Sequence, residues 1–300
     1  MLNLRFFFDI WLHTLFEQTA MKKFLIFLLL LHVSTQVSWG QCEPQQETDT
    51  YRNRAYAKGT VRCGEKEGVW KYYDRKDRLI KRIQFEGGQF HGEHLIWYKT
   101  GKKKSVANYK GGKLDGTYSR WTSNGELIEE SNYKNGLLHG TSKFWAENGV
   151  LISSTTYENG SKSGKFELYW KNALIKERGT YTENQLDGLY QSYYENGKLS
   201  SQINYNSGIR HGSYTTYFED GKVSVVGSYE NGIQNKAWKI YYPTGQLQSS
   251  GEYTMGAKNG IWQEWFQSGT QKSKGEYLND DRIGIWYEWT ASGKRKKIKY

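Results

Sequence analysis

Histidines and carboxylates that stand beside glycines and aromatic residues are the groups in this chain that could do chemistry. The stretch YKNGLLHGTSKFWAENG, residues 133–149, brings together His139, Trp145 and Glu147. A histidine near a carboxylate can act in general acid–base catalysis or bind a metal ion. Whether these residues have such a role depends on whether the stretch occurs only once in the chain.

The stretch is one copy of a repeat of 24 residues. Aligning the chain on a G-x-W/Y motif defines the units, and we number its first residue, the anchor, as position 0. The anchors are Gly68, Gly92, Gly116, Gly140, Gly164, Gly188, Gly212, Lys236, Gly260 and Gly284. No insertion disturbs this period, and a fixed period of this length is the signature of a repeat architecture.

The repeat separates the candidate catalytic histidines from one another. Two strands per unit would give a rise of about 9.5 Å, so His91 and His139, two units apart, would be about 19 Å from each other. Metal ligands bind at about 2 Å, so these histidines cannot share an ion. They stand directly before the anchor, where other units have Asp, Ser or Asn, and these residue types are typical of turns. We therefore interpret His139 as a turn residue and His94, at position +2, as a packing residue.

The repeat also separates the carboxylates from one another. Turns contain one glutamate per unit, and the adjacent pair Glu129–Glu130 would point to opposite faces of a strand. A glycosidase instead needs two carboxyl groups about 5 to 9.5 Å apart across a cleft. The sequence has no G-x-S-x-G, no phosphate loop and no H-E-x-x-H motif. We predict no enzyme activity and no catalytic, cofactor-binding or metal-binding residues.

Each unit predicts a β-hairpin. Positions +1 to +6 are rich in aromatic residues, as in SYTTYF, which favours a strand. Asn-Gly or Asp-Gly follows and predicts a two-residue turn, after which positions +10 to +17, as in KLSSQINY, form a second strand. A further turn, as in KNGLLHG, leads into the next unit. The fold class we predict is all-β, an elongated antiparallel β-meander of 24-residue hairpin repeats with about twenty strands.

A two-residue turn places position +2 opposite +15, +4 opposite +13 and +6 opposite +11. Position +2 is mostly aromatic and position +15 is glycine in several units, and an aromatic ring can cover a glycine on the neighbouring strand. We predict a packed face that carries these two positions, the tyrosines at +17 and the leucines at +11: Leu79, Leu127, Leu151, Leu199 and Leu247.

Position +5 is aromatic in all ten units and should project from the opposite face, since side chains alternate along a strand. These candidate binding residues are Tyr73, Trp97, Trp121, Trp145, Tyr169, Tyr193, Tyr217, Tyr241, Trp265 and Trp289. Their expected neighbours at +10, +12 and +14 are Lys102, Lys104, Lys176, Arg178, Lys198, Lys222, Lys272 and Lys274. The rings could stack on sugars, hold an extended polymer or peptide, or brace the sheet through cross-strand contacts.

The N-terminal residues predict export. Residues 21–40 start with Met21, Lys22 and Lys23, continue with an apolar run and end with small residues at Ser38 and Gly40, which predicts signal-peptide cleavage before Gln41. The apolar run is short for a membrane span, and a retained anchor is the alternative. Residues 1–20 read as an upstream extension, with translation starting at Met1 or at Met21. We expect the protein in the periplasm, on the cell surface or in the medium.

Two cysteines, Cys42 and Cys63, follow the predicted cleavage site. In an oxidising compartment they predict a disulfide, worth about 3 kcal/mol in the chain-entropy model. Two free thiols would instead require a reducing compartment. We divide the exported chain into an N-terminal cap with a degenerate repeat (41–67), an array of about ten units (68–293) and a basic C-terminal tail (294–300).

The net charge is +11, and five positive charges lie close to the C-terminus. They are Lys294, Arg295, Lys296, Lys297 and Lys299. Such a segment could contact acidic lipids, glycans or nucleic acid, or it could only increase solubility. Export disfavours nucleic acid as the partner.

Units such as GLYQSYYENGKLSSQINYNSGIRHG resemble MORN repeats, in the variant common in bacterial proteins. The Y-x-N-G-x-x-x-G spacing and the E-N-G-K-L turn carry the resemblance, which covers roughly residues 64–300. It implies a long array of β-hairpins that mediates protein or membrane association, without catalytic residues; some bacterial members are described as antitoxins. The pattern lapses at Asp77, Ala173, Lys236 and Asp280.

We therefore expect an exported, non-catalytic scaffold that binds a partner protein through a long aromatic β-surface and uses no cofactor. One alternative is a binder of envelope polysaccharide or of an acidic membrane surface, acting through the position +5 rings and the basic tail. The other is an antitoxin-like neutraliser of a partner protein.

Overall fold

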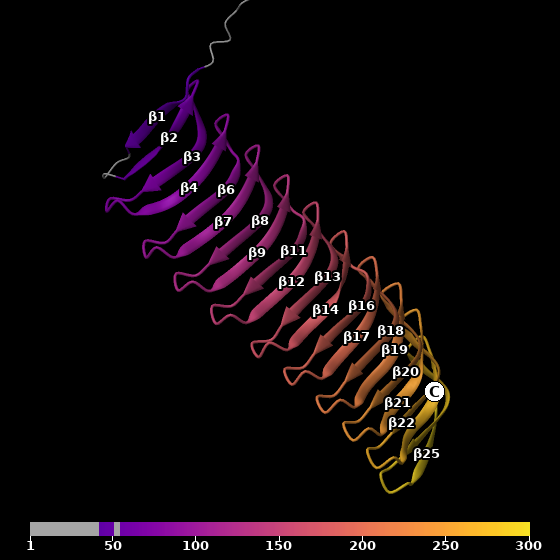
Figure 1. Ribbon diagram of the computed structural model, residues 1–300. Coiled ribbons are helices and arrows are strands. Elements are labelled where there is room, and N and C mark those ends of the chain that lie inside the picture. The colour runs from indigo at the N-terminus through magenta and orange to yellow at the C-terminus, as the bar shows by residue number, and fades with distance from the viewer. Residues whose placement is uncertain (1–41, 51–54) are drawn as a thin grey trace, which may run out of the picture.

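The computed structural model describes residues 42–50 and 55–300. They form one open antiparallel sheet of 25 strands, and no helix occurs within these two ranges. Figure 1 shows the strands side by side in chain order along a long, curved array. The predicted all-β meander is confirmed. The predicted signal peptide (21–40) and the upstream extension (1–20) lie outside the described residues.

The strands are β1 (Gln45–Thr50), β2 (Tyr56–Arg62), β3 (Glu65–Tyr73), β4 (Leu79–Glu86), β5 (Gln89–Phe90), β6 (Gly92–Trp97), β7 (Lys103–Lys110), β8 (Lys113–Trp121), β9 (Leu127–Lys134), β10 (Leu137–Leu138), β11 (Gly140–Trp145), β12 (Leu151–Glu158), β13 (Ser161–Tyr169), β14 (Ile175–Thr182), β15 (Gln185–Leu186), β16 (Gly188–Tyr193), β17 (Leu199–Asn206), β18 (Ile209–Tyr217), β19 (Val223–Glu230), β20 (Ile233–Tyr241), β21 (Leu247–Thr254), β22 (Ala257–Trp265), β23 (Gln271–Leu278), β24 (Asp281–Trp289) and β25 (Arg295–Lys299). Each unit contributes one hairpin. The count exceeds the expected twenty because β1 and β2 form an additional N-terminal hairpin and three first strands are split in two.

A disulfide joins Cys42 and Cys63, with their Cα atoms 5.3 Å apart. Cys63 and Gly64 both have positive φ and form the turn between β2 and β3. The bond therefore ties the chain in front of the first strand to a turn two strands further along, which closes the N-terminal hairpin.

Most units have two turns of different conformation, as the two Asn-Gly dipeptides of the unit that begins at Gly140 show. In the turn between β11 and β12, only Gly149 has positive φ, and its N–H donates to the carbonyl of Ala146 at 2.9 Å. The N–H of Ala146 donates to the carbonyl of Val150 at 2.8 Å, which makes a three-residue loop of a type I turn followed by a left-handed glycine. The predicted two-residue turn at this place was wrong, because the asparagine does not take a left-handed conformation.

The second Asn-Gly forms the two-residue turn. Asn159 and Gly160 both have positive φ, at 49° and 87°, as a type I′ turn requires. The N–H of Gly160 also donates to the carbonyl of Leu138 in the preceding hairpin, at 2.8 Å. Equivalent bonds recur in most units, so each of these turns is attached to its predecessor.

The anchor residue itself is a β-bulge. All ten anchors have positive φ, including Lys236 at 66°, and the strand register shifts where the anchor stands. Glycine is favoured there because it adopts this conformation without a steric cost. The residue before the anchor donates its backbone N–H to the preceding strand, as His139 does to Asn132 at 2.8 Å.

A second bulge changes which residues of the second strand lie on each face of the sheet, compared with the sequence prediction. Position +4 pairs with +13, as predicted, but +5 pairs with +11, so +12 is an additional residue in the second strand. In one unit Ser192 pairs with Ser201 and Tyr193 pairs with Leu199. The predicted placement of the +11 leucines on the packed face was wrong, because the bulge turns them to the face of the +5 rings.

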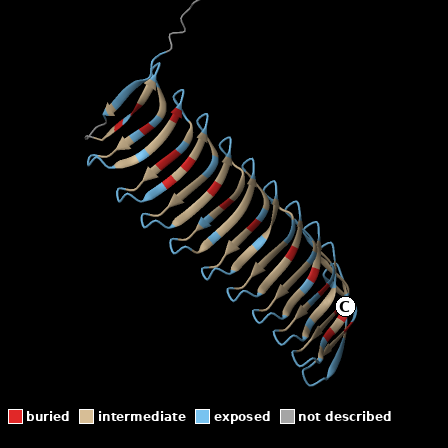
Figure 2. Ribbon diagram, viewed as in Figure 1, coloured by how far each residue is buried: buried red, intermediate tan, exposed pale blue. Residues whose placement is uncertain are grey.

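We call the side that carries positions +2, +15 and +17 the ladder face, and the side that carries position +5 the stripe face. Tryptophans at +2 are the most buried large residues: Trp70 is 0% and Trp286 is 1% exposed. Figure 2 shows that burial is concentrated in the middle of the strands while the turns are exposed. Because the sheet is a single layer, the rings reach this burial by packing edge to face along the array.

Each of these tryptophans covers a glycine of the preceding unit. A Cβ added to Gly251 would lie 2.2 Å from the Trp262 ring, and one added to Gly275 would lie 2.1 Å from Trp286. The prediction of a ring over a cross-strand glycine is confirmed, but the ring leans backward rather than over its own unit. Phe166 is an exception and covers Gly179 of its own unit.

Candidate functional site

The stripe face carries the ten predicted +5 rings, and each is half-buried. The bulge places a +11 residue opposite each ring, so that Trp121 pairs with Leu127 and Trp145 pairs with Leu151. In most units the +11 residue is aliphatic, so one side of the ring can pack on it while the other stays accessible. In the remaining units it is Lys103, Gln271 or Arg295. The structure thus assembles an aromatic stripe, with aliphatic neighbours in most units, that runs the length of the array.

Cations flank this stripe, but fewer than the sequence predicted. The guanidinium of Arg178 at +14 lies 5.4 Å from the centre of the Tyr193 ring and donates to Gln191 at 2.8 Å. The ammonium of Lys103 lies 6.0 Å from the Trp121 ring. Contacts at these distances are cation–π interactions.

The lysines at +12 lie on the other face, because the bulge turns this position towards the ladder side. Lys176 is 4.9 Å from the Trp170 ring, and Lys272 pairs with Glu264 at 3.2 Å. The prediction that Lys104, Lys176 and Lys272 flank the stripe was therefore wrong. Lysines at +10 instead follow the turns, as Lys198 does in donating to the carbonyl of Asp220 at 2.8 Å.

Tyrosines in the stripe hydrogen-bond to position +3 of their own strand. The Tyr193 hydroxyl donates to Gln191 at 3.2 Å, and the Tyr169 hydroxyl donates to Glu167. Burial, followed by this bond to Glu167, raises the pKa of Tyr169 to about 12. Tyr169 therefore offers a neutral phenol group near neutral pH.

A further aromatic position, +6, was missed by the sequence analysis. Tyr98 donates its hydroxyl to the carbonyl of Trp121 at 2.9 Å, and the Trp170 indole N–H donates to the carbonyl of Tyr193 at 3.1 Å. Tyr194 and Tyr242 make the same bond to the +5 carbonyl of the next unit. The recurrence of an aromatic residue directly after the +5 ring was the available signal, and these side chains fix the spacing of the stripe.

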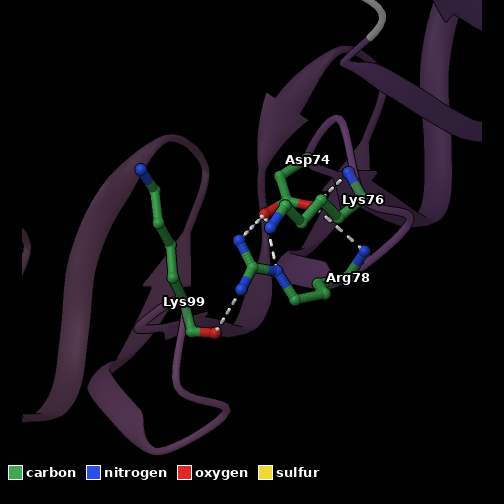
Figure 3. A network of polar contacts seen from close by, with 4 residues as sticks. All are labelled: Asp74, Lys76, Arg78 and Lys99. Carbon is green, nitrogen blue, oxygen red and sulfur yellow. Dashed lines mark hydrogen bonds and ion pairs between the residues drawn. The ribbon is translucent and has the colours of Figure 1, made fainter.

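In the turn of the first full unit an ion pair, rather than an aromatic side chain, connects the unit to the next one (Figure 3). Asp74 accepts from the guanidinium of Arg78 at 2.6 Å and from the backbone N–H of Lys76 at 2.8 Å. Arg78 also donates to the carbonyl of Lys99 in the next unit at 3.0 Å. Mainly because of the bond from Arg78, the pKa of Asp74 is lowered to about 2.

His94 replaces a tryptophan rather than forming a chemical site. Its Nε2 lies 3.0 Å from the carbonyl of Gln84, at the repeat position whose carbonyl accepts the indole N–H of Trp262 and Trp286 in later units. Burial lowers the pKa of His94, which favours the neutral ring. The interpretation of this residue as packing agrees with these contacts.

The basic C-terminal segment is part of the sheet. Lys294 lies in the last turn, and Arg295, Lys296, Lys297 and Lys299 lie in β25, which pairs with β24. The structure thus presents these charges along the last strand rather than on a free tail.

Within residues 42–50 and 55–300 no group of three or more His, Cys, Asp or Glu side chains is placed to hold a metal ion. The same part of the chain contains no helix of the length and hydropathy needed to cross a membrane.

Comparison with protein families matches six segments of the chain to the MORN repeat variant: residues 90–110, 114–135, 138–159, 186–207, 210–231 and 234–254. No curated protein matches the chain. The matched segments begin and end near the type I′ turns, so each match covers one structural hairpin.

Proposed function

We propose that this chain, which is a MORN-repeat protein, is an exported, non-catalytic scaffold that binds a partner protein along its stripe face. MORN repeats generally serve as protein-interaction or membrane-interaction modules, and this all-β scaffold is generally non-catalytic.

The observation that carries the proposal is the half-buried state of the stripe rings. The tryptophans of the ladder face are buried against neighbouring rings, as Trp262 is against Tyr253, whereas all ten stripe rings stay half-buried and recur about every 9.5 Å. Accessible aromatic side chains on a rigid sheet are the residue type enriched at the centre of protein interfaces. The bonds from the +6 residues hold these rings at a fixed spacing before any partner binds, which lowers the entropic cost of association.

The Cys42–Cys63 disulfide supports the export part of the proposal, because such bonds persist in oxidising compartments.

A capture experiment tests this function. The chain starting at Gln41 would be immobilised and incubated with envelope and secreted fractions, and bound proteins would be identified by mass spectrometry. We expect a partner that is lost when Trp121 and Trp145 are both changed to alanine. Phe144→Ala is the matched control, because Phe144 is an exposed aromatic residue next to Trp145 on the ladder face.

Loss of the partner with Phe144→Ala but not with the double stripe variant would refute the stripe face as the binding surface. A partner that proves to be a toxin would assign the antitoxin-like role within the same scheme.

A second function, binding to envelope polysaccharide or an acidic membrane surface, is favoured by the cations over the stripe rings and by the basic β25. Charge reversal of Lys294–Lys297 should then release the protein from isolated envelopes without unfolding it. Unchanged retention of that variant and of Trp121→Ala/Trp145→Ala would exclude this second function.

A further inference from the structure

The ladder face contains a place where its regular packing is interrupted. In the C-terminal units a tryptophan at +2 fills the space between two successive +17 tyrosines. Trp238 lies 5.4 Å from the Tyr229 ring and 5.8 Å from the Tyr253 ring, measured between ring centres. Trp262 fills the next gap in the same way.

The unit that begins at Gly188 has a smaller ring at this position. Tyr190 contacts Tyr205 of its own unit at 6.0 Å, while Phe166 leans forward over Gly179 and packs on Tyr181 at 4.7 Å. Tyr190 also stacks on Phe166, with the ring centres 6.4 Å apart, so the space that a tryptophan would fill between Tyr181 and Tyr205 is only partly occupied. A hollow of about 400 Å³ lies there, floored by apolar side chains that include Leu186 and Ile203.

Two cations line this hollow. Lys162 lies 5.0 Å from the Tyr181 ring, and Arg210 lies 5.3 Å from the Tyr229 ring. At the same repeat position elsewhere, Lys66 pairs with Asp49 and Arg282 pairs with Glu288, both at 2.9 Å. Across the described residues, Lys162 and Arg210 form no such pair with a carboxylate, and Arg210 donates instead to the Tyr229 hydroxyl at 3.4 Å. These two cations outnumber the one carboxylate, Glu177, that lines the hollow.

The hollow also contains a hydrogen-bond acceptor. Glu177 lines it and is hydrogen-bonded to the Tyr190 hydroxyl. A second hollow of about 430 Å³ also contains Glu177 and continues towards Trp170 and Tyr194. The two hollows share Glu177 and are lined by aromatic rings, hydroxyl groups and charges of both signs.

We propose that these hollows bind an acidic oligosaccharide, with the carboxylate of one uronic acid unit at Lys162 and that of another unit at Arg210. Arginine binds carboxylates through charge-assisted hydrogen bonds, and Glu177 accepts hydrogen bonds from sugar hydroxyls. The apolar face of a pyranose ring packs against the tyrosine and tryptophan rings. Sites of this size combine an aromatic lining with few polar groups that fix orientation. This site is on the opposite face from the proposed protein-binding stripe and does not depend on it.

Calorimetric titration of the intact chain with digalacturonate tests the proposal. We expect saturable binding that becomes at least tenfold weaker in the double variant Lys162→Gln/Arg210→Gln. Tyr190→Trp should abolish binding by filling the hollow with the ring that the C-terminal units have. Lys258→Gln is the matched control, because Lys258 has the same repeat position but lies over Trp262, where the gap is filled.

Maltose and benzoate test which chemical groups of the ligand are needed for binding. Maltose lacks the carboxylate and benzoate lacks the hydroxyl groups, so both should bind at least tenfold more weakly than digalacturonate. Equal binding of either compound, the absence of digalacturonate binding by the unmodified chain, or an equal loss with Lys258→Gln would overturn the proposal. Far-UV circular dichroism and thermal melting of each variant separate a lost site from a lost fold.

Discussion

The ladder face is built in two ways in two regions of the array. Its C-terminal region, from Trp238 to Trp286, alternates tryptophans with tyrosines in edge-to-face contacts. Its central region has Ser142 at the tryptophan position, with Ser131 and Thr155 as the neighbours at +15. Ser131 is 0% and Ser142 is 1% exposed. Along this described stretch no ring contact connects Tyr133 with Phe166.

The difference shows that the +15 position decides how the ladder packs. Every tryptophan at +2 has a glycine eleven residues before it, because any Cβ at that place would penetrate the ring. In the centre the +15 residues are serine and threonine, and no tryptophan fits. Ser142 is buried there with a hydroxyl that has no hydrogen-bond partner, which costs free energy. In repeat proteins stability is close to a sum of local terms, so the two regions should differ in stability.

Removing a tryptophan from the ladder face should have the largest effect on stability, and it tests whether the two regions differ. Trp262→Ala removes a side chain that is 4% exposed and its hydrogen bond to the Glu252 carbonyl. We expect a loss of about 3–5 kcal/mol in the free energy of unfolding of the C-terminal region, measured by urea unfolding. Hydrogen exchange would locate the loss to β20–β24.

Tyr118→Ala is the control for this change. Tyr118 contacts one neighbouring ring, Tyr133, and it should cost less when removed. An equal loss for Tyr118→Ala would mean that the two regions do not differ in the way their contacts indicate.

Adding a methyl group under a ring is the second test. Gly251→Ala places a Cβ 2.2 Å from the Trp262 ring, which must move against its tyrosine neighbours. Such overpacking costs about 1–3 kcal/mol. Gly179→Ala should cost less, because its Cβ would lie 2.9 Å from the edge of the smaller Phe166 ring. Thermal melting of both variants checks the order, and a smaller loss for Gly251→Ala would contradict the backward lean of the tryptophans.

Much of the architecture was predictable because it follows from the period and from side-chain alternation. The 24-residue repeat, the pairing of +2 with +15 and the opposite facing of +2 and +5 came from the sequence alone. The bulge at +12 did not, because counting residues from an assumed two-residue turn fixes the register with no room for an additional residue. That one residue moved Leu199 to the stripe face and Lys176 away from it.

The hollow beside Tyr190 could not be predicted either. It arises from the direction in which Phe166 leans, and that direction depends on which neighbouring residue lacks a Cβ. Periodic columns describe what each unit has in common, whereas this site depends on a local departure from the period. The stripe of +5 rings was found because it is strictly periodic; whether it binds a partner stays a prediction.

The smallest expected effect concerns pH, since His94 takes a tryptophan position but can be protonated. Burial lowers its pKa in the folded state below the unfolded value of about 6.5. The folded state therefore disfavours protonation, and this stabilising contribution is present above about pH 6.5 and is lost as the pH falls below it. We expect the N-terminal units around β4–β7 to become less protected in hydrogen exchange between pH 7 and pH 5. The protection of the C-terminal ladder in hydrogen exchange should stay unchanged over the same range, because Trp238, Trp262 and Trp286 do not titrate.

His94→Gln should remove the pH dependence of the N-terminal units, since a glutamine keeps a donor for the Gln84 carbonyl without a titrating ring. A pH response of equal size in both regions would mean that His94 is not its source and that the two halves of the ladder do not differ in this respect.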